Sequence, residues 1–394
     1  MMTLKMKMKP LQTLYVTQFL SAFADNMILF ITLAIIKQSA FPAYYIGVVQ
    51  ASFLVAFVIL APFVGAYADK NAKSHVLLVG NAIKGIGIIA LFLHLDPAVS
   101  YGIVGIGAAV YSPAKYGILP SLTKSDHELL KANARIEGYT IMAILLGSVC
   151  GGILAQFSLT GSILVCLGLY LVSLLMSLQI PKIAGNATIR YGKEAKAFVN
   201  DVAFLLKNRT TRFSLVGTGS FWMTSSVVRL AIIAWVPAHL GIESVDQISM
   251  LVAVTGIGIM IGALLTPKLI PARKYYNSFV FGIVMIVSIL LFPLISNLYV
   301  TIGLLLLIGF SGGVFIVPMN TVLQDKGQRM IGAGKTIAVQ NLLENAMMLA
   351  GVGIYTQISA DGLSPDSSIT GIAVILAGFV GYLILQRQRL KLIA

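Results

Sequence analysis

The sequence is poor in charge. Only 11% of its 394 residues are Asp, Glu, Lys or Arg, whereas 58% are hydrophobic and the mean hydropathy is +0.91. A soluble domain carries roughly 25% charged residues. So little charge cannot cover a water-facing surface, which excludes a soluble globular protein and favours an integral membrane protein. Acidic residues are the scarcest charged group, with 14 Asp and Glu against 28 Lys and Arg.

Residues that carry redox, metal or covalent chemistry are also few. The two cysteines, Cys150 and Cys166, lie inside apolar runs and are typical of small buried side chains rather than of a disulfide framework. The four histidines are scattered, so we expect no metal site and no cofactor. Because no nucleophile and base are set together, the sequence argues against an enzyme such as an acyltransferase. It also lacks the basic face of a soluble nucleic-acid-binding domain, so we expect no nucleic-acid partner.

Long apolar runs are what the sequence has instead. A run of about 20 residues is long enough to cross a bilayer as a helix. Twelve such runs lie near 13–36, 45–68, 75–95, 99–121, 132–155, 160–180, 212–237, 247–270, 276–294, 298–321, 333–358 and 368–386. The sequence therefore predicts an all-α membrane protein with twelve transmembrane helices.

The positive charges between these runs fall on one side. Lys and Arg occupy the two termini and every second connection, and the other side has only Lys37. Positively charged connections remain in the cytoplasm, so both termini are predicted to be cytoplasmic. The asymmetry also explains most of the net charge of +14.

The longest connection divides the chain into two halves. We expect a six-helix bundle at 1–180, a cytoplasmic linker at 181–211 and a second six-helix bundle at 212–394. The end of the linker alternates apolar and charged residues with the period of an amphipathic helix, which predicts a helix lying on the membrane surface that tethers the two halves. Its apolar positions are Ala197, Phe198, Val202, Leu205 and Leu206.

The two halves resemble each other. SPAKYGIL at 112–119 is followed by Glu137, and VPMNTVLQ at 317–324 is followed by Glu344 at a comparable spacing. A parallel repeat of six-helix halves is a known transporter architecture.

Several motifs carry a resemblance to known families. GAYADKNAK at 65–73 resembles the loop signature of the major facilitator superfamily, with Ala72 where that family usually has glycine. In that family the aspartate and basic residues, here Asp69, Lys70 and Lys73, lock the cytoplasmic side. QFLSAFADN at 18–26, GAAVYSPAKYGIL at 107–119 and AVQNLLEN at 338–345 are similar to bacterial lysophospholipid transporters.

This narrower resemblance implies a function. It implies a flippase of the bacterial inner membrane that moves lysophosphatidylethanolamine, and lysophosphatidylglycerol, from the outer to the inner leaflet without ATP or an ion gradient. It also implies a functional link to a cytoplasmic-face acyltransferase and acyl-carrier synthetase that reacylate the product. We expect the protein to act as a monomer among membrane lipids. A proton-coupled facilitator for drugs or small solutes is the alternative, since Asp25 and Glu344 are acids within predicted spans.

Six of the charged residues inside the predicted spans are candidates for functional roles. They are Asp25, Lys84, Lys115, Glu137, Arg229 and Glu344. A charge at a helix centre costs about 2.5–3.5 kcal/mol on insertion, so such side chains face the bundle interior and mark functional positions.

These charges suit the head group of a lysophospholipid. Lys115, in the inward half, and Arg229, in the outer half, are candidates for binding phosphate. Asp25 and Glu344, near the midplane, are candidates for binding the ethanolamine ammonium. The alternative interpretation is pairing, for example of Lys115 with Glu137 and of Asp25 with Arg229. We assign Lys84 and Glu137 to gating or structural roles.

Uncharged polar residues and two glycine pairs are further candidates for functional positions in the spans. Asn26 lies next to Asp25, and one polar face predicted to line the cavity holds Gln340, Asn341, Glu344 and Asn345. The pairs Gly147/Gly151 and Gly258/Gly262 allow close helix contact, either as a lateral gate between spans five and eight or as ordinary tight packing.

Overall fold

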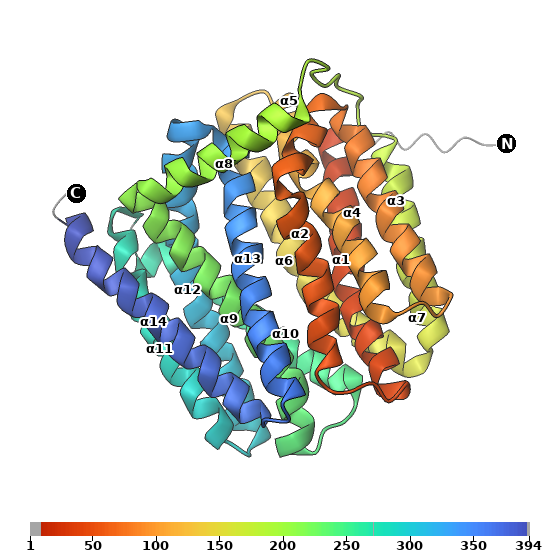
Figure 1. The fold of residues 1–394 in the computed structure, drawn as a ribbon, viewed down its shortest axis with the longest axis vertical. Helices are drawn as coiled ribbons and strands as arrows, with labels where there is room; N and C mark the ends of the chain where they lie inside the picture. The colour runs from red at the N-terminus through yellow and green to blue at the C-terminus, as the bar shows by residue number, and fades with distance from the viewer. Residues whose placement is uncertain (1–8, 271, 392–394) are drawn as a thin grey trace.

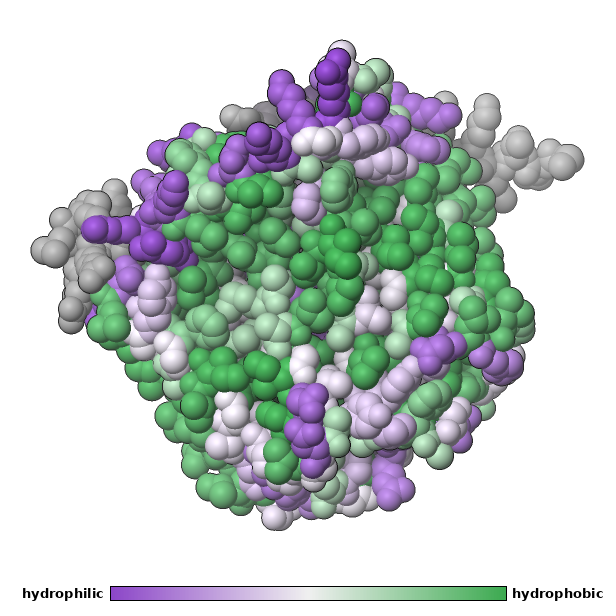
Figure 2. Space-filling view, viewed as in Figure 1, coloured by the Kyte–Doolittle hydropathy of each residue, from purple (hydrophilic) through white to green (hydrophobic). Residues whose placement is uncertain are grey.

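A computed structural model describes residues 9–270 and 272–391; at a few helical positions, including Glu137, only the backbone is described. These residues form a bundle of long helices that run between two ends of the molecule (Figure 1). We call the end where the linker helix lies the linker end and the opposite end the far end. Figure 2 shows a broad apolar surface between more hydrophilic ends, as expected for a protein that crosses a bilayer.

The N-terminal half contains six long helices and one short turn of helix. The long helices are α1 (Pro10–Gln38), α2 (Tyr45–Lys70), α3 (Lys73–Phe92), α4 (Pro97–Gly117), α6 (Asp126–Phe157) and α7 (Leu159–Ser177), and α5 is Leu119–Leu122. Polar side chains begin several of them. Asp96 accepts hydrogen bonds from the backbone N–H groups of Ala98 and Val99, with Pro97 at the first position of α4, which satisfies donors that the helix itself leaves unpaired.

The linker helix α8 (Tyr191–Lys207) leads into the C-terminal half. This half contains α9 (Arg209–Leu240), α10 (Val245–Leu269), α11 (Phe279–Leu291), α12 (Leu298–Ile331), α13 (Ala333–Ala360) and α14 (Pro365–Lys391). The 3₁₀ segments Ala272–Ser278 and Phe292–Leu294 flank α11, which is therefore shorter than its predicted span.

Eleven helices in the described residues are long and apolar enough to cross a membrane. The twelfth bundle helix is α4, whose Gly, Ser, Tyr and Pro residues lower its hydropathy although it packs between α2 and α3. The predicted fold of twelve helices in two six-helix halves is confirmed. The main difference in length is α12, which continues past its predicted end at 321 to Ile331 as a polar extension.

The glycine pairs pack inside each half and not between the halves. A side chain at Gly147 or Gly151 would overlap backbone of Phe23 or Met27 in α1, and one at Gly258 or Gly262 would overlap backbone of α12. The expectation that these pairs form a lateral gate between α6 and α10 is therefore wrong, and the tight-packing alternative is correct. The two helices do meet between the halves, through Gly152 against Ser249.

The interface between the halves differs at its two ends. At the far end, Gly47 of α2 lies against Thr356 of α13, and Lys37 Nζ donates to the backbone oxygen of Glu243 at 2.8 Å. At the linker end the halves are separated by a cavity. The halves therefore contact each other at the far end and have a cavity between them at the linker end.

Candidate functional site

The cavity at the linker end has a volume of about 260 Å³ and lies between α2, α4, α13 and the linker helix α8. Most of its wall is apolar. Its polar lining includes Asp69, Ser112, Glu194, Asp201 and Asn341. Both halves and the linker thus contribute to one hollow beneath α8.

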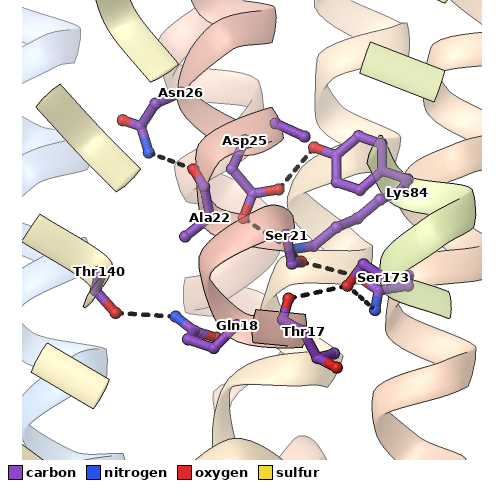
Figure 3. A network of polar contacts seen from close by, with 12 residues as sticks. Thr17, Gln18, Ser21, Ala22, Asp25, Asn26, Lys84, Thr140 and Ser173 are labelled. Atoms are coloured by element: carbon purple, nitrogen blue, oxygen red, sulfur yellow. Dashed lines mark hydrogen bonds and ion pairs between the residues drawn. The ribbon is translucent and has the colours of Figure 1, made fainter. Parts of the chain in front are cut away.

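A second polar site fills the interior of the N-terminal half, around Asp25 of α1 (Figure 3). Lys84 Nζ of α3 lies 2.7 Å from Asp25 Oδ2, and the hydroxyl of Tyr170 on α7 donates to Asp25 Oδ1 at 2.7 Å. The ion pair of Asp25 is therefore with Lys84 and not with Arg229. The side chain of Lys84 is 2% exposed and that of Asp25 is 18% exposed, so Asp25 is the more accessible member of the pair.

Further hydrogen bonds fix this pair in place. Lys84 Nζ also donates to Ser21 Oγ, which donates to Asn81 Oδ1, both at 2.8 Å. Asn81 Nδ2 donates to Ser173 Oγ, and Ser173 in turn donates to the backbone oxygen of Thr17, each at 2.9 Å (Figure 3). A buried ammonium is tolerated when its counter-charge and its other donors are satisfied. The network therefore ties α1, α3 and α7 into one unit.

Arg229 of α9 is arranged differently. It is partly buried, and within the described residues it has no ion pair and no side-chain hydrogen bond. Its guanidinium lies close enough to the hydroxyl of Tyr101 on α4 to interact electrostatically across the two halves. Tyr101 is 4% exposed, donates weakly to the backbone oxygen of Asp25 at 3.4 Å and stacks on Phe53. Tyr101 thus lies between the N-terminal network and the cation of the C-terminal half.

Lys115 lies near the end of α4 and is not among the residues that line the cavity. Its Nζ is 4.8 Å from the centre of the Tyr116 ring, and Tyr116, Pro113 and Gly117 line the cavity. The helix continues through Pro113 to Gly117. The side chain of Glu137 lies outside the described residues, so its pairing with Lys115 stays a prediction.

Some polar residues of α13 form hydrogen bonds inside the C-terminal half, and another lines the cavity. Gln340 Nε2 donates to Asn320 Oδ1 of α12 and to Glu344 Oε1, both at 2.8 Å, and Glu344 is 8% exposed. Asn341 lines the cavity instead. In the N-terminal half, Asn26 Nδ2 donates to the backbone oxygen of Ala22 at 2.9 Å.

The loop between α2 and α3 contacts the linker. Lys73 Nζ lies 3.0 Å from Asp69 Oδ1, the backbone N–H of Asn186 donates to the backbone oxygen of Asp69, and Lys70 Nζ lies over the ring of Tyr191 at 4.8 Å. The signature loop of the N-terminal half therefore holds the start of α8.

Sequence reasoning missed four residues of these sites. Tyr101 and Tyr170 contact Asp25, and a tyrosine inside an apolar run is itself a signal because its hydroxyl needs a partner. Glu194 and Asp201 line the cavity from α8, where a spacing of seven residues places both on one helix face. Asp201 also pairs with Lys335 of α13 at 3.2 Å.

Comparison with known proteins agrees with this architecture. The profile of the Major Facilitator Superfamily matches residues 14–352. The lysophospholipid transporter LplT of Serratia proteamaculans (strain 568) is 39% identical over 377 residues, 95% of this chain and 94% of the relative. This chain belongs to the lysophospholipid transporter family of the Major Facilitator Superfamily. Transporters of the same name from Klebsiella pneumoniae and Salmonella typhimurium are 40% and 42% identical and cover 91% and 88% of both chains.

A solved structure supports the fold of this family member. The crystal structure of the nucleoside transporter NupG superimposes with a TM-score of 0.70 over 97% of this chain and 98% of that chain, at 14% identity. At that identity the likeness concerns the fold alone. The chain is a multi-pass membrane protein of a transporter family, and neither its family nor its relatives are enzymes.

Proposed function

We propose that this protein transports lysophospholipids, chiefly lysophosphatidylethanolamine and lysophosphatidylglycerol, from the outer to the inner leaflet of a bacterial inner membrane. The observation that carries the proposal is the identity of 39–42% with lysophospholipid transporters over nearly the whole of each chain. The partly buried cation Arg229, which lacks a counter-charge in the described residues, supports it because the substrate brings a phosphate.

The linker end is proposed to face the cytoplasm. Basic residues gather at this end and only Lys37 lies in a connection at the far end, which is the asymmetry of cytoplasmic and external connections. Both termini are then cytoplasmic, and the structure is the state that opens inward. A division at 181–211 into two moving halves is supported by their contacts at the far end and by the cavity between them at the linker end.

The head group is proposed to bind between the halves. Arg229 binds phosphate when the outer half is open, as a bidentate donor, and Lys115 binds it near the cytoplasmic exit. The partly accessible Asp25 side chain contacts the ethanolamine ammonium while Lys84 and Tyr170 hold its carboxylate in place. Asn26, Asn341, Gln340 and Glu344 add hydrogen bonds along the way.

The acyl chain is proposed to leave through the apolar side of the cavity. Phe57, Ala61 and Val64 of α2 and Ala338 and Leu342 of α13 face the same hollow. An acyl chain in contact with this wall stays out of water while the head group follows the charges. The transported lipid then becomes a substrate for a cytoplasmic-face acyltransferase with its acyl-carrier synthetase, and a monomer suffices because one chain supplies the whole site.

A leaflet-resolved assay tests the proposal. Labelled lysophosphatidylethanolamine is added to the outer leaflet of proteoliposomes, and the fraction that albumin can no longer extract is followed with time. We expect the wild type to protect the label faster than vesicles without protein, and Lys115→Ala to slow this rate. Equal rates with and without the protein would contradict lysophospholipid transport. Loss of flux on collapse of a proton gradient would favour the proton-coupled alternative.

A further inference from the structure

The linker helix α8 separates its charges by sign. Its two acidic residues, Glu194 and Asp201, line the cavity together with Phe198. Phe198 and Leu205 are buried and pack in a cluster with Leu323 and Val339 of the C-terminal half. This inner face of α8 therefore lines the cavity and packs against the C-terminal half.

The opposite face of α8 has no partner within the described residues. It carries the exposed residues Lys193, Lys196 and Lys207, and none of these lysines forms an ion pair in the part of the chain that the structure describes. Val199 and Phe204 flank the lysines and are 61% and 52% exposed. We call these five residues the outer face of α8. A row of ammonium groups between two bulky apolar side chains is typical of a helix that lies at a membrane interface.

The position of α8 shows which surface this face meets. In Figure 1 α8 crosses in front of α2 and α13 at the linker end, and α8 packs against both helices. Figure 2 shows that hydrophilic surface along this end borders the apolar surface of the bundle. The outer face of α8 therefore lies where lipid head groups adjoin the hydrocarbon of the bilayer, beside the opening of the cavity.

We propose that the outer face of α8 is a docking surface for anionic phospholipid head groups of the bilayer. The lysines bind the phosphates, and Val199 and Phe204 enter the acyl region beside them. A lipid surface fits better than an acidic soluble protein. Acidic side chains would pair with the lysines but would leave Val199 and Phe204 without apolar contact, whereas a bilayer supplies both phosphates and hydrocarbon. The proposal rests on the proposed cytoplasmic orientation of the linker end, but not on the identity of the transported lipid.

This docking would act on the opening between the halves. The start of α8 contacts α2 through Lys70 and Tyr191, and its middle is paired with α13 through Asp201 and Lys335. Anionic lipid bound along the outer face holds α8 against the bilayer while both contacts remain. The lipid composition of the bilayer thereby sets how firmly α8 covers the cavity.

An environment-sensitive probe on α8 tests this directly. Phe204→Cys is made in the full chain with Cys150→Ser and Cys166→Ser, labelled with the fluorophore NBD, and reconstituted into vesicles of phosphatidylcholine with increasing phosphatidylglycerol. We expect a blue shift that grows with phosphatidylglycerol and weakens in high salt. In Lys193→Gln/Lys196→Gln/Lys207→Gln, the phosphatidylglycerol response should fall by about fivefold for each lysine removed.

The matched control removes the same charge elsewhere. Lys124, Lys274 and Lys326 are exposed and lie outside α8, and their triple change to Gln should leave the response intact. Replacing the three α8 lysines by Arg should also preserve it. A fluorescence response that ignores phosphatidylglycerol, or an equal loss in both triple variants, would overturn the proposal. Transport in pure phosphatidylcholine vesicles is measured separately, so failure of the proposed function gives a different result.

Discussion

Buried charge is arranged in opposite ways in the two halves. In the N-terminal half, Asp25 and Lys84 lie 2.7 Å apart, and Tyr170, Ser21 and their neighbours satisfy the remaining donors and acceptors. In the C-terminal half, Arg229 has no ion pair among the described residues and interacts electrostatically with Tyr101 from the other half. A charge that is compensated within its own half is suited to holding helices together. A charge without compensation is suited to a ligand that brings its own counter-charge.

The largest expected effect is on Arg229. In Arg229→Gln we expect the rate of lysophospholipid flipping to fall at least about 30-fold, since a desolvated charged contact contributes about 2 kcal/mol or more. The thermal midpoint in detergent should not fall, because no ion pair of Arg229 is broken in the described residues. Arg229→Lys, which retains the charge, should keep part of the activity. A lower thermal midpoint together with a normal flipping rate would show that Arg229 stabilises the fold and does not bind the substrate. The contrast between the two halves would then be wrong.

The next effect is on the N-terminal pair. Lys84→Met leaves the Asp25 carboxylate without its counter-charge, and we expect a loss of about 3–5 kcal/mol in stability, measured as a lower thermal midpoint. Asp25→Asn/Lys84→Met removes both charges and should recover most of that loss.

The double variant also separates two roles of Asp25. If Asp25 contacts the ammonium, the stable double variant should still flip lysophosphatidylethanolamine poorly relative to lysophosphatidylglycerol, which has no ammonium. Equal and normal rates for both lipids would leave Asp25 with pairing alone.

A cross-link at the far end tests whether the two halves must move relative to each other during transport. A Cβ atom at position 47 would lie 3.1 Å from Cβ of Thr356, slightly closer than the roughly 3.5–4.5 Å found in disulfides, so the bond needs the two helices to move apart by a few tenths of an ångström. Gly47→Cys/Thr356→Cys, with Cys150→Ser and Cys166→Ser, should form a disulfide that abolishes flipping. Reductant should restore the flipping rate. The single cysteine variants under the same oxidant serve as controls. Undiminished flipping in the cross-linked protein would mean that the halves need not separate there.

The helices were predictable from the sequence because each span is set by local hydropathy. Even α4, the least apolar of the twelve, was predicted from the length of its apolar run. The partners of the buried charges were not predictable. Asp25 and Lys84 are 59 residues apart, and only the packing of α1 against its neighbours brings Lys84, rather than Arg229, to the carboxylate. The choice between a lateral gate and tight packing at the glycine pairs was left open for the same reason, since a small residue shows that a helix comes close without showing which one.

The smallest expected effect is at the linker, where an ion pair near solvent joins α8 to α13 of the C-terminal half. Lys335 is 51% exposed and Asp201 is 17% exposed, and a pair of this kind contributes about 0–1 kcal/mol. Lys335→Gln should therefore change the flipping rate less than about fivefold, with a larger effect at low than at high salt because salt screens exposed charges. Asp325→Asn, which breaks the exposed pair with Arg329 within α12, is the matched control. A loss in Lys335→Gln as large as that in Arg229→Gln would show that the linker contact, and not the uncompensated cation between the halves, controls transport.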